Sequence, residues 1–181
     1  RQFYFRQNLG AGVYKGGVYG TNNNYAANTQ LGDIMHTATT PGAAITCAEV
    51  EFLKAEAVER GLITGDAEEF YNNGVTASIM EWGGTSAMAT AYLANPAVAY
   101  TTAEGNWKQK IGTQKWMALF NNGLEGWNSW KLLDFTGFNA PDGMTLGDIP
   151  TRLIYPVNEA TLNGTSLNAA IAAIGGNSKT G

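Results

Sequence analysis

Four glutamates on one predicted helix have a spacing that could support acid–base catalysis. Glu49 and Glu56 are seven positions apart and would share a helix face, with Glu51 and Glu59 close by. Hydrolysis of a glycosidic bond needs two carboxylates at a fixed separation across a cleft. Lysine and arginine lie among these glutamates, which is typical of a solvated helix surface. Spacing alone therefore selects no catalytic pair.

Other catalytic chemistry is narrowly limited, because the chain has one histidine, His36, and one cysteine, Cys47. A Ser-His-Asp or Cys-His arrangement would depend on His36 alone, in a threonine-rich loop without a nucleophile-elbow serine. Sites built from two histidines or paired cysteines are excluded, so we expect no metal and no cofactor. Cys47 has no disulfide partner, and its apolar helical pattern predicts a buried, inert thiol.

Rings and amides near the N-terminus are the best candidates for ligand binding. Glycines alternate there with short apolar pairs, a pattern of extended loops or short strands. The candidate ligand-binding residues of this segment are Tyr14, Tyr19, Asn22, Asn23 and Tyr25. A tyrosine ring can lie against the C–H face of a sugar while amides exchange hydrogen bonds with its hydroxyls. Alternatively, the tyrosines pack on the helical body and the asparagines hold turns.

Tryptophans divide between two predicted roles. Trp82 and Trp107 lie at predicted helix ends near loops, which makes them the better candidates among the tryptophans for exposed rings that contact a ligand. Trp116, Trp127 and Trp130 are assigned to the core, because a buried aromatic ring of this size removes a large area from water.

Composition excludes some classes of partner. The chain has 181 residues, of which only 14% are charged, and its net charge is −4. Nucleic-acid binding needs a basic patch, and the lysines and arginines are scattered here. No apolar run approaches the ~20 residues of a membrane span. The few charges indicate a surface covered by uncharged polar groups, which suits sugars better than phosphates. The same composition is equally expected of a protein outside the cytoplasm that simply uses uncharged polar residues on its surface.

Helix start and stop signals predict a helical body that follows an irregular segment. Thr46 with Glu49 has capping-box spacing, and an apolar stripe of Val50, Leu53 and Ala57 follows. Further helices are predicted to begin at Asp66, at Thr85 and near Leu167. The tryptophan-rich helix should begin at Thr101 or Thr102 and end in a left-handed cap at residues 121–123. We expect one domain over residues 1–181, with an irregular loop and strand segment at 1–45 and a helical body at 46–181.

Three segments resemble the SusD/RagB family of outer-membrane glycan-binding lipoproteins. They are the run TCAEVEFLKAEAVERGLITGDAEEFYNNGVTASIMEWG from Thr46, IGTQKWMALFNNGLEGWNSWKLLDFTGF from Ile111, and IPTRLIYPVNEATLN from Ile149. A closing R-x-x-Y-P-x-x-E-x-x-x-N pattern, carried over as structural residues only, is matched by Arg152, Tyr155, Pro156, Glu159 and Asn163. The order and spacing of the three segments make the match more specific than one motif would.

The resemblance implies a mostly α-helical fold with tetratricopeptide-like hairpins, irregular loops and a few short strands. It also implies a cell-surface, non-catalytic subunit that binds an oligosaccharide, a polysaccharide or another nutrient. Such a subunit is seated on a SusC-like TonB-dependent transporter of the outer membrane and attached to the membrane by an N-terminal lipid anchor. Because Arg1–Phe5 begins abruptly in a strand-like pattern and the expected preceding repeats are absent, we expect the chain to be a fragment.

Two alternatives stay open. One is a helical carbohydrate-active enzyme that uses two of the carboxylates, and the other is a helical-repeat module that binds a protein partner. Release of reducing ends from a glycan would indicate the enzyme, whereas capture of a barrel protein with a blank glycan array would favour the interaction module.

Overall fold

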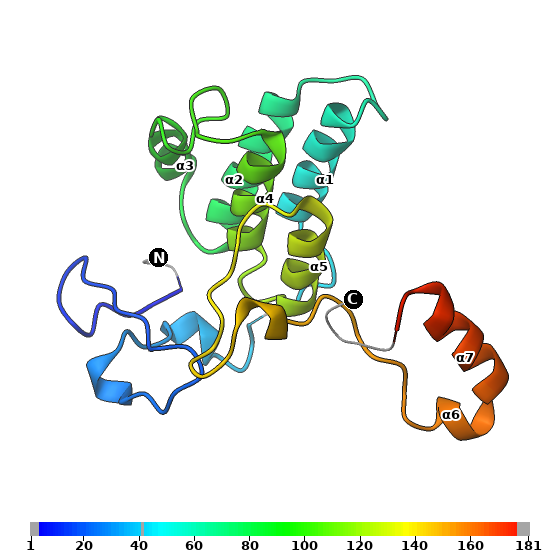
Figure 1. The fold of residues 1–181 in the computed structure, drawn as a ribbon. Coiled ribbons are helices and arrows are strands. Elements are labelled where there is room, and N and C mark those ends of the chain that lie inside the picture. The colour runs from blue at the N-terminus through cyan, green and yellow to red at the C-terminus, as the bar shows by residue number, and fades with distance from the viewer. Residues whose placement is uncertain (1–3, 41, 177–181) are drawn as a thin grey trace. The chain divides into compact units, whose positions relative to one another are not determined.

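Seven α-helices make up most of the regular structure, and no strand occurs among the residues that the structure describes. The computed structural model describes residues 4–40 and 42–176. It has two structural units, one formed by Arg1–Gly16 and Asn24–Gly137 and the other by Gly17–Asn23 and Phe138–Gly181 (Figure 1). The predicted mostly α-helical fold is confirmed. Within the described ranges no helix is both long and apolar enough to span a membrane.

The first two α-helices of the first unit, α1 (Cys47–Glu59) and α2 (Ala67–Glu81), form a hairpin in the two places where capping signals predicted helices. The Thr46 hydroxyl oxygen accepts from the Glu49 amide at 3.1 Å. The Asp66 carboxylate accepts from the Glu68 and Glu69 amides. Each cap satisfies amide groups that the first turn of a helix leaves without partners. The chain leaves α1 at Gly61, whose φ of 71° is one that glycine adopts at little cost.

The buried face of α1 differs from the predicted stripe. Val50 and Leu53 are 39% and 40% exposed, whereas Phe52 and Ala55 are fully buried. The prediction was wrong because the buried face carries small alanines and glutamates rather than a continuous row of large apolar residues. Phe52 packs against Gly74 of α2, where an added Cβ would lie 3.0 Å from its ring. The two helices therefore approach closely at this glycine.

A short helix, α3 (Ser86–Leu93), follows and packs on α2. Turns then lead to α4 (Trp107–Ala118). The Tyr71 hydroxyl of α2 donates to the Val98 carbonyl oxygen at 2.6 Å and so attaches this turn region to the core.

The N-terminus of α4 lies several residues after the position predicted for it. A capping box of Asn106 and Gln109 starts the helix, with each side chain accepting from the backbone amide of the other residue. The prediction of Thr101 or Thr102 as the cap was wrong, because the Thr102 hydroxyl instead donates to the Pro96 carbonyl oxygen and Gly105 has a φ of 87°. Glycine in that conformation ends the turns before the helix begins.

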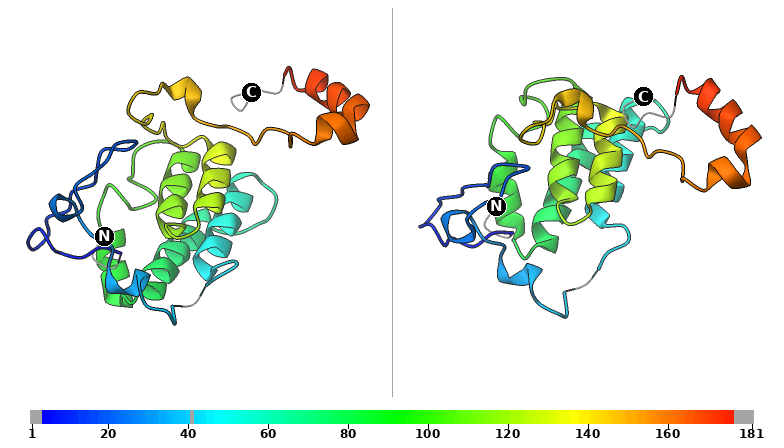
Figure 2. Two further views of the ribbon diagram at one scale, coloured as in Figure 1. Left: turned by 90° about the horizontal axis from the view of Figure 1, so that it is seen from below. Right: turned by 60° about the horizontal axis from the view of Figure 1, so that its bottom comes forward.

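Helix α5 (Gly123–Leu133) follows α4 after a short connection, and the two pack side by side (Figure 2). The predicted left-handed cap at residues 121–123 was wrong. Asn122 instead caps α5 by accepting from the Glu125 amide, and Gly123 is the first helical residue. The left-handed residue is Asp134, with a φ of 48°, at the other end of α5. Asparagine suits both a helix start and a left-handed cap, so its residue type alone cannot distinguish the two.

The core of the first unit contains part of the predicted tryptophan cluster. Ile111 and Leu133 are fully buried, and Trp130 packs against this core. Trp130 also donates from Nε1 to the Thr136 carbonyl oxygen at 2.7 Å. Trp127 is half-buried, with the Lys131 ammonium 4.7 Å from its ring centroid. The core assignment was wrong for Trp116, which is 45% exposed.

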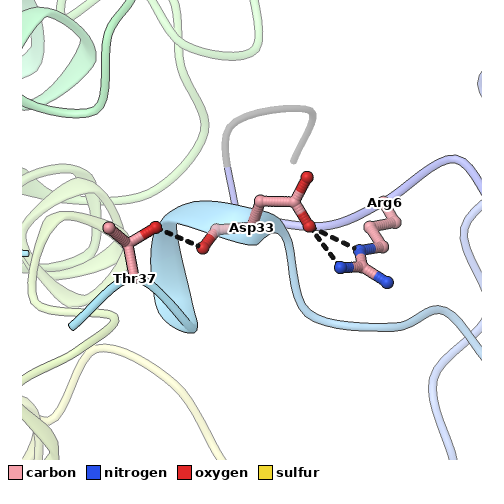
Figure 3. A network of polar contacts seen from close by, with 3 residues as sticks. All are labelled: Arg6, Asp33 and Thr37. Carbon is pink, nitrogen blue, oxygen red and sulfur yellow. Dashed lines mark hydrogen bonds and ion pairs between the residues drawn. The ribbon is translucent and has the colours of Figure 1, made fainter.

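The N-terminal part of this unit is irregular, as predicted, but lacks the expected strands within the residues described. Phe5 and Leu31 form an isolated antiparallel bridge, and the predicted strand residues 1–3 lie outside the described residues. Two 3₁₀ turns follow, Tyr25–Ala27 and Asp33–Met35. Figure 3 shows that Arg6 donates to the Asp33 carboxylate while the Thr37 hydroxyl donates to the Asp33 carbonyl oxygen. Frequent glycines and asparagines favour turns here over paired strands.

The second unit has two short helices, α6 (Glu159–Leu162) and α7 (Gly164–Ala173), and neither contains a buried residue. A 3₁₀ turn, Leu146–Asp148, precedes them. The Asp142 amide donates to the Tyr19 carbonyl oxygen at 3.0 Å, which joins the two segments of this unit.

Candidate functional site

The candidate residues of the N-terminal loops differ in how they are held. Tyr19 and Tyr25 are 69% and 68% exposed, and Tyr14 is half-buried. Tyr14 and Tyr25 belong to the first unit, whereas Tyr19, Asn22 and Asn23 share one loop of the second. Exposed rings can stack on a ligand, and the loop of the second unit presents one such ring beside two amides.

The Asn23 side chain is committed to its own loop. Its Oδ1 accepts from the Val18 amide at 2.7 Å, and its Nδ2 donates to the carbonyl oxygens of Val18 and Thr21 at 2.8 and 3.0 Å. Gly17 packs so closely on this amide that an added Cβ would lie 2.6 Å from it. Asn23 therefore stabilises the loop, whereas the Asn22 side chain forms no hydrogen bond with any described residue and is exposed.

The two candidate tryptophans lie at helix ends, as their positions predicted, and both are half-buried. Trp107 starts α4 and packs against the core, with the Arg60 guanidinium 5.4 Å from its ring centroid. Trp82 follows α2 and meets the Tyr4 ring edge-on at a centroid distance of 4.6 Å. Phe120 lies on the same cluster, 4.7 Å from Tyr4. Packing of this kind fixes the orientation of both indoles.

Trp82 also forms part of a pocket of about 150 Å³ in the first unit. Four separate parts of the chain contribute to it. Its lining residues are Ile34, Thr40, Ala43, Thr46, Glu81, Trp82, Ala118, Leu119, Asn121 and Asn122. The lining combines one indole and several apolar groups with a carboxyl group, two amides and two hydroxyls, which is the usual make-up of a small-molecule site.

Glu81, Asn121 and Asn122 were missed by the sequence interpretation. The two asparagines were assigned to a helix cap, and Glu81 was not considered. A usable signal existed, since an aromatic residue next to a carboxylate at one helix end and paired amides at another are side chains that bind polar ligands. The sequence did not show that the ends of α2 and α4 meet.

The glutamates of the catalytic alternative do not line this pocket. Glu49 and Glu56 are 6% and 5% exposed and lie near the buried Lys115 of α4. Burial lowers the pKa of Lys115, and the nearby charges of Glu56 and Glu49 oppose that shift. These two side chains are therefore almost completely covered within the first unit.

Glu51 and Glu59 have partners of other kinds. Glu51 accepts from Lys54 at 2.7 Å, one turn along α1, and Glu59 accepts from the Tyr100 hydroxyl. His36 is exposed at the end of a 3₁₀ turn. Cys47 is exposed as well, so the prediction of a buried thiol was wrong. As the first residue of α1, Cys47 precedes the turns of the helix that pack into the core.

Comparison with known proteins identifies the family. The family model described as starch-binding and associating with the outer membrane matches residues 1–156. A SusD-like protein from Bacteroidetes is 30% identical with a TM-score of 0.72, and the match covers 86% of this chain and 32% of that one. A chitin-binding protein is 32% identical with a TM-score of 0.71, over 86% of this chain and 36% of its own.

A SusD homologue from Parabacteroides distasonis is 26% identical with a TM-score of 0.72, and the match covers 98% of this chain and 41% of that one. The matches thus span 32–41% of the length of these solved structures. Comparison with curated proteins found no match. The matched residues and the shared helical fold show that this chain belongs to the SusD-like family of starch-binding proteins that associate with the outer membrane.

Proposed function

We propose that this chain belongs to a cell-surface protein that captures a glycan, or another nutrient, for uptake and does not transform it. Membership of the SusD-like family is the observation that carries the proposal. That family is described as starch-binding, and one similar protein of known structure is a chitin-binding protein. Both ligands are neutral sugar polymers, and the low charge of this chain suits such a ligand.

Capture would depend on aromatic rings and amides held by a rigid helical scaffold. We assign the loop contacts to Tyr14, Tyr19, Asn22 and Tyr25, with Asn23 holding the loop that presents Tyr19. Exposed tyrosine rings can stack on a sugar at a low cost in conformational entropy, since a tyrosine has only two rotatable side-chain bonds. Trp82 and Trp107 are the candidate rings of the helical body.

The partner in this proposal is a SusC-like TonB-dependent transporter, and the place of action is the outer face of the outer membrane, with a lipid anchor on the whole protein. The family description, association with the outer membrane, supports this location. Pull-down from outer-membrane extracts, with this chain as bait, should recover a TonB-dependent barrel protein. A gene for such a receptor directly upstream would support the same partnership.

Glycan binding is tested by affinity electrophoresis and calorimetry with starch, chitin oligosaccharides and other neutral glycans. Tyr19→Ala and Tyr25→Ala should each weaken binding without lowering the melting temperature, because both rings are largely exposed. Leu62→Ala is the matched control, since it removes a side chain that is 73% exposed in the connection between α1 and α2. Unchanged affinity in both tyrosine variants would overturn the loop assignment.

The catalytic alternative is tested in the same reactions. Release of reducing ends from any of these glycans by the purified chain, abolished by a single Glu→Gln change, would overturn the non-catalytic proposal. The interaction-module alternative would instead give recovery of a barrel protein together with a blank glycan panel.

A further inference from the structure

The pocket beside Trp82 contains polar groups that lack partners within the described part of the chain. Neither the Glu81 carboxyl group nor the Asn121 amide forms a hydrogen bond there. Asn122 uses its Oδ1 to cap α5, which leaves its NH₂ group as a donor without an acceptor. The Trp82 Nε1 group is buried and also has no acceptor. Of these groups only the indole N–H is buried, since Glu81 and Asn121 are exposed. A buried polar group normally has a partner, so the Trp82 Nε1 group, beside the open hydrogen-bonding capacity of the two asparagines and Glu81, marks a place where a polar ligand would satisfy it.

The size of the pocket limits what it can hold. A cavity of about 150 Å³ in another protein accommodates a single benzene molecule, so a pocket of this volume fits about one six-membered ring. Ile34, Ala43 and Leu119 provide apolar contacts, which suit the C–H face of a pyranose ring. The amides and the carboxyl group lie in the same lining and suit its hydroxyls.

The charge of the pocket lining indicates which class of sugar it would bind. Glu81 is the only ionisable residue that lines the pocket among the residues described, and no lysine or arginine accompanies it. Burial raises the pKa of Glu81. A carboxylate accepts strong hydrogen bonds from sugar hydroxyls, whereas the carboxylate of a uronic acid placed beside it would be repelled. The N-terminal amides of α1 and α5 compensate little for that repulsion, because Thr46 and Asn122 already bond to them.

We propose that this pocket binds one neutral pyranose residue of the captured glycan, with Glu81, Asn121 and Asn122 as its hydrogen-bonding partners and Trp82 as its aromatic wall. The inference rests on the proposed capture function and adds a specificity-determining residue to it. Glu81 selects neutral sugars against acidic ones.

The test uses the Trp82 indole N–H as a reporter. The indole resonances of the full chain are recorded by NMR, and the Trp82 signal is assigned with the Trp82→Phe variant. Four neutral probes, glucose, galactose, mannose and N-acetylglucosamine, are titrated to millimolar concentrations alongside glucuronic and galacturonic acids. We expect saturable movement of the Trp82 signal with at least one neutral sugar and none with the corresponding acid.

Variants separate this pocket from the tyrosine loops. Glu81→Gln and Asn121→Ala should bind the responding sugar about tenfold more weakly, since one hydrogen bond to a ligand corresponds to roughly one order of magnitude in affinity. Glu81→Gln should in addition reduce the discrimination against the uronic acid. Asn73→Ala is the control, because Asn73 is exposed on α2 and does not line the pocket. Melting temperatures of all three variants establish that they are folded.

The outcomes distinguish the pocket proposal from the proposed capture function. If polymeric glycans bind but no neutral monosaccharide moves the Trp82 signal, or if both pocket variants bind as tightly as the parent, the pocket proposal is wrong and glycan capture stands. Equal response to glucose and glucuronic acid, or response to cationic glucosamine alone, would also overturn it. Absence of binding to every polymer and monosaccharide would contradict the capture function itself.

Discussion

Two glycine-to-alanine changes in neighbouring helices should alter stability in opposite directions. Gly112 lies inside α4 and Gly126 inside α5, and both are buried. Alanine is favoured over glycine in a helix interior by about 1 kcal/mol, so local propensity alone predicts that both changes stabilise the protein. The surroundings of each glycine decide which prediction holds.

At Gly112 the available space is already filled. An added Cβ would lie 2.5 Å from two atoms of the Phe135 ring and 2.6 Å from its Cβ. Phe135 is only 6% exposed and belongs to the core, so it has little room to move away. Forcing an extra methyl group into a packed core costs about 1–3 kcal/mol. After the gain in helix propensity, we expect Gly112→Ala to lower the free energy of unfolding by up to about 2 kcal/mol.

At Gly126 the nearest atoms belong to the Trp116 ring, at 3.6 and 3.7 Å, which is ordinary van der Waals contact. Gly126→Ala should therefore raise the free energy of unfolding by about 0.5–1 kcal/mol. Urea denaturation followed by circular dichroism measures both changes without relying on tryptophan fluorescence. For a chain of this size, 1 kcal/mol corresponds to a shift of about 2–4 °C in melting temperature. If Gly112→Ala raises the free energy of unfolding as much as Gly126→Ala does, the inference that Phe135 leaves no room beside Gly112 is wrong.

Three further changes test other contacts of the first unit. Tyr71→Phe should lower the free energy of unfolding by about 1–3 kcal/mol, because the buried Val98 carbonyl oxygen loses its donor. Burial raises the pKa of Tyr71, so the stability it contributes is complete below its ordinary pKa of about 10 and is lost as the pH rises through the folded value. Denaturation series above pH 10 should therefore show a shallower loss of stability in this variant than in the parent, and parallel curves would contradict that. Asn106→Ala should cost about 1 kcal/mol through loss of the capping box of α4, measured by urea denaturation, with the exposed Asn73→Ala as a neutral control. Phe52→Ala should lower the free energy of unfolding by about 3–5 kcal/mol, because Phe52 is fully buried. Trp116→Ala should cost less than Phe52→Ala, because the Trp116 ring is 45% exposed.

Local signals in the sequence predicted where helices begin better than they predicted which helix faces are buried. The caps at Thr46 and Asp66 were located correctly, because a side chain that accepts from an amide two or three residues later is a purely local interaction. The start of α4 was missed, since threonine and asparagine are both good caps and the conformation of Gly105 decided between them. The face of α1 was misjudged because which residues are buried depends on where α2 and α4 pack, and no local pattern contains that information.

In the candidate site, too, the features set by local sequence could be predicted and those set by packing could not. Exposed Tyr19 and Tyr25 could be anticipated from a glycine-rich and asparagine-rich loop, where a large ring has few neighbours to cover it. The pocket could not be anticipated, because its lining combines Ile34, three residues that precede α1 (Thr40, Ala43 and Thr46), the end of α2 and the connection between α4 and α5. The packing of α4 on both α1 and α2 brings the ends of these helices together.

The position of the pocket also explains why its polar groups can remain without partners in a stable fold. The helix interiors bury Phe52, Tyr71 and Ile111 and provide the stability, whereas the pocket lies at the ends of helices, where backbone groups already need side-chain partners. Thr46 and Asn122 satisfy those backbone groups with one oxygen each. Their remaining hydrogen-bonding capacity, together with Glu81 and Asn121, does not contribute to folding. Substitutions that remove these free groups should therefore affect ligand binding more than stability, which is the pattern that separates a binding pocket from a packing defect.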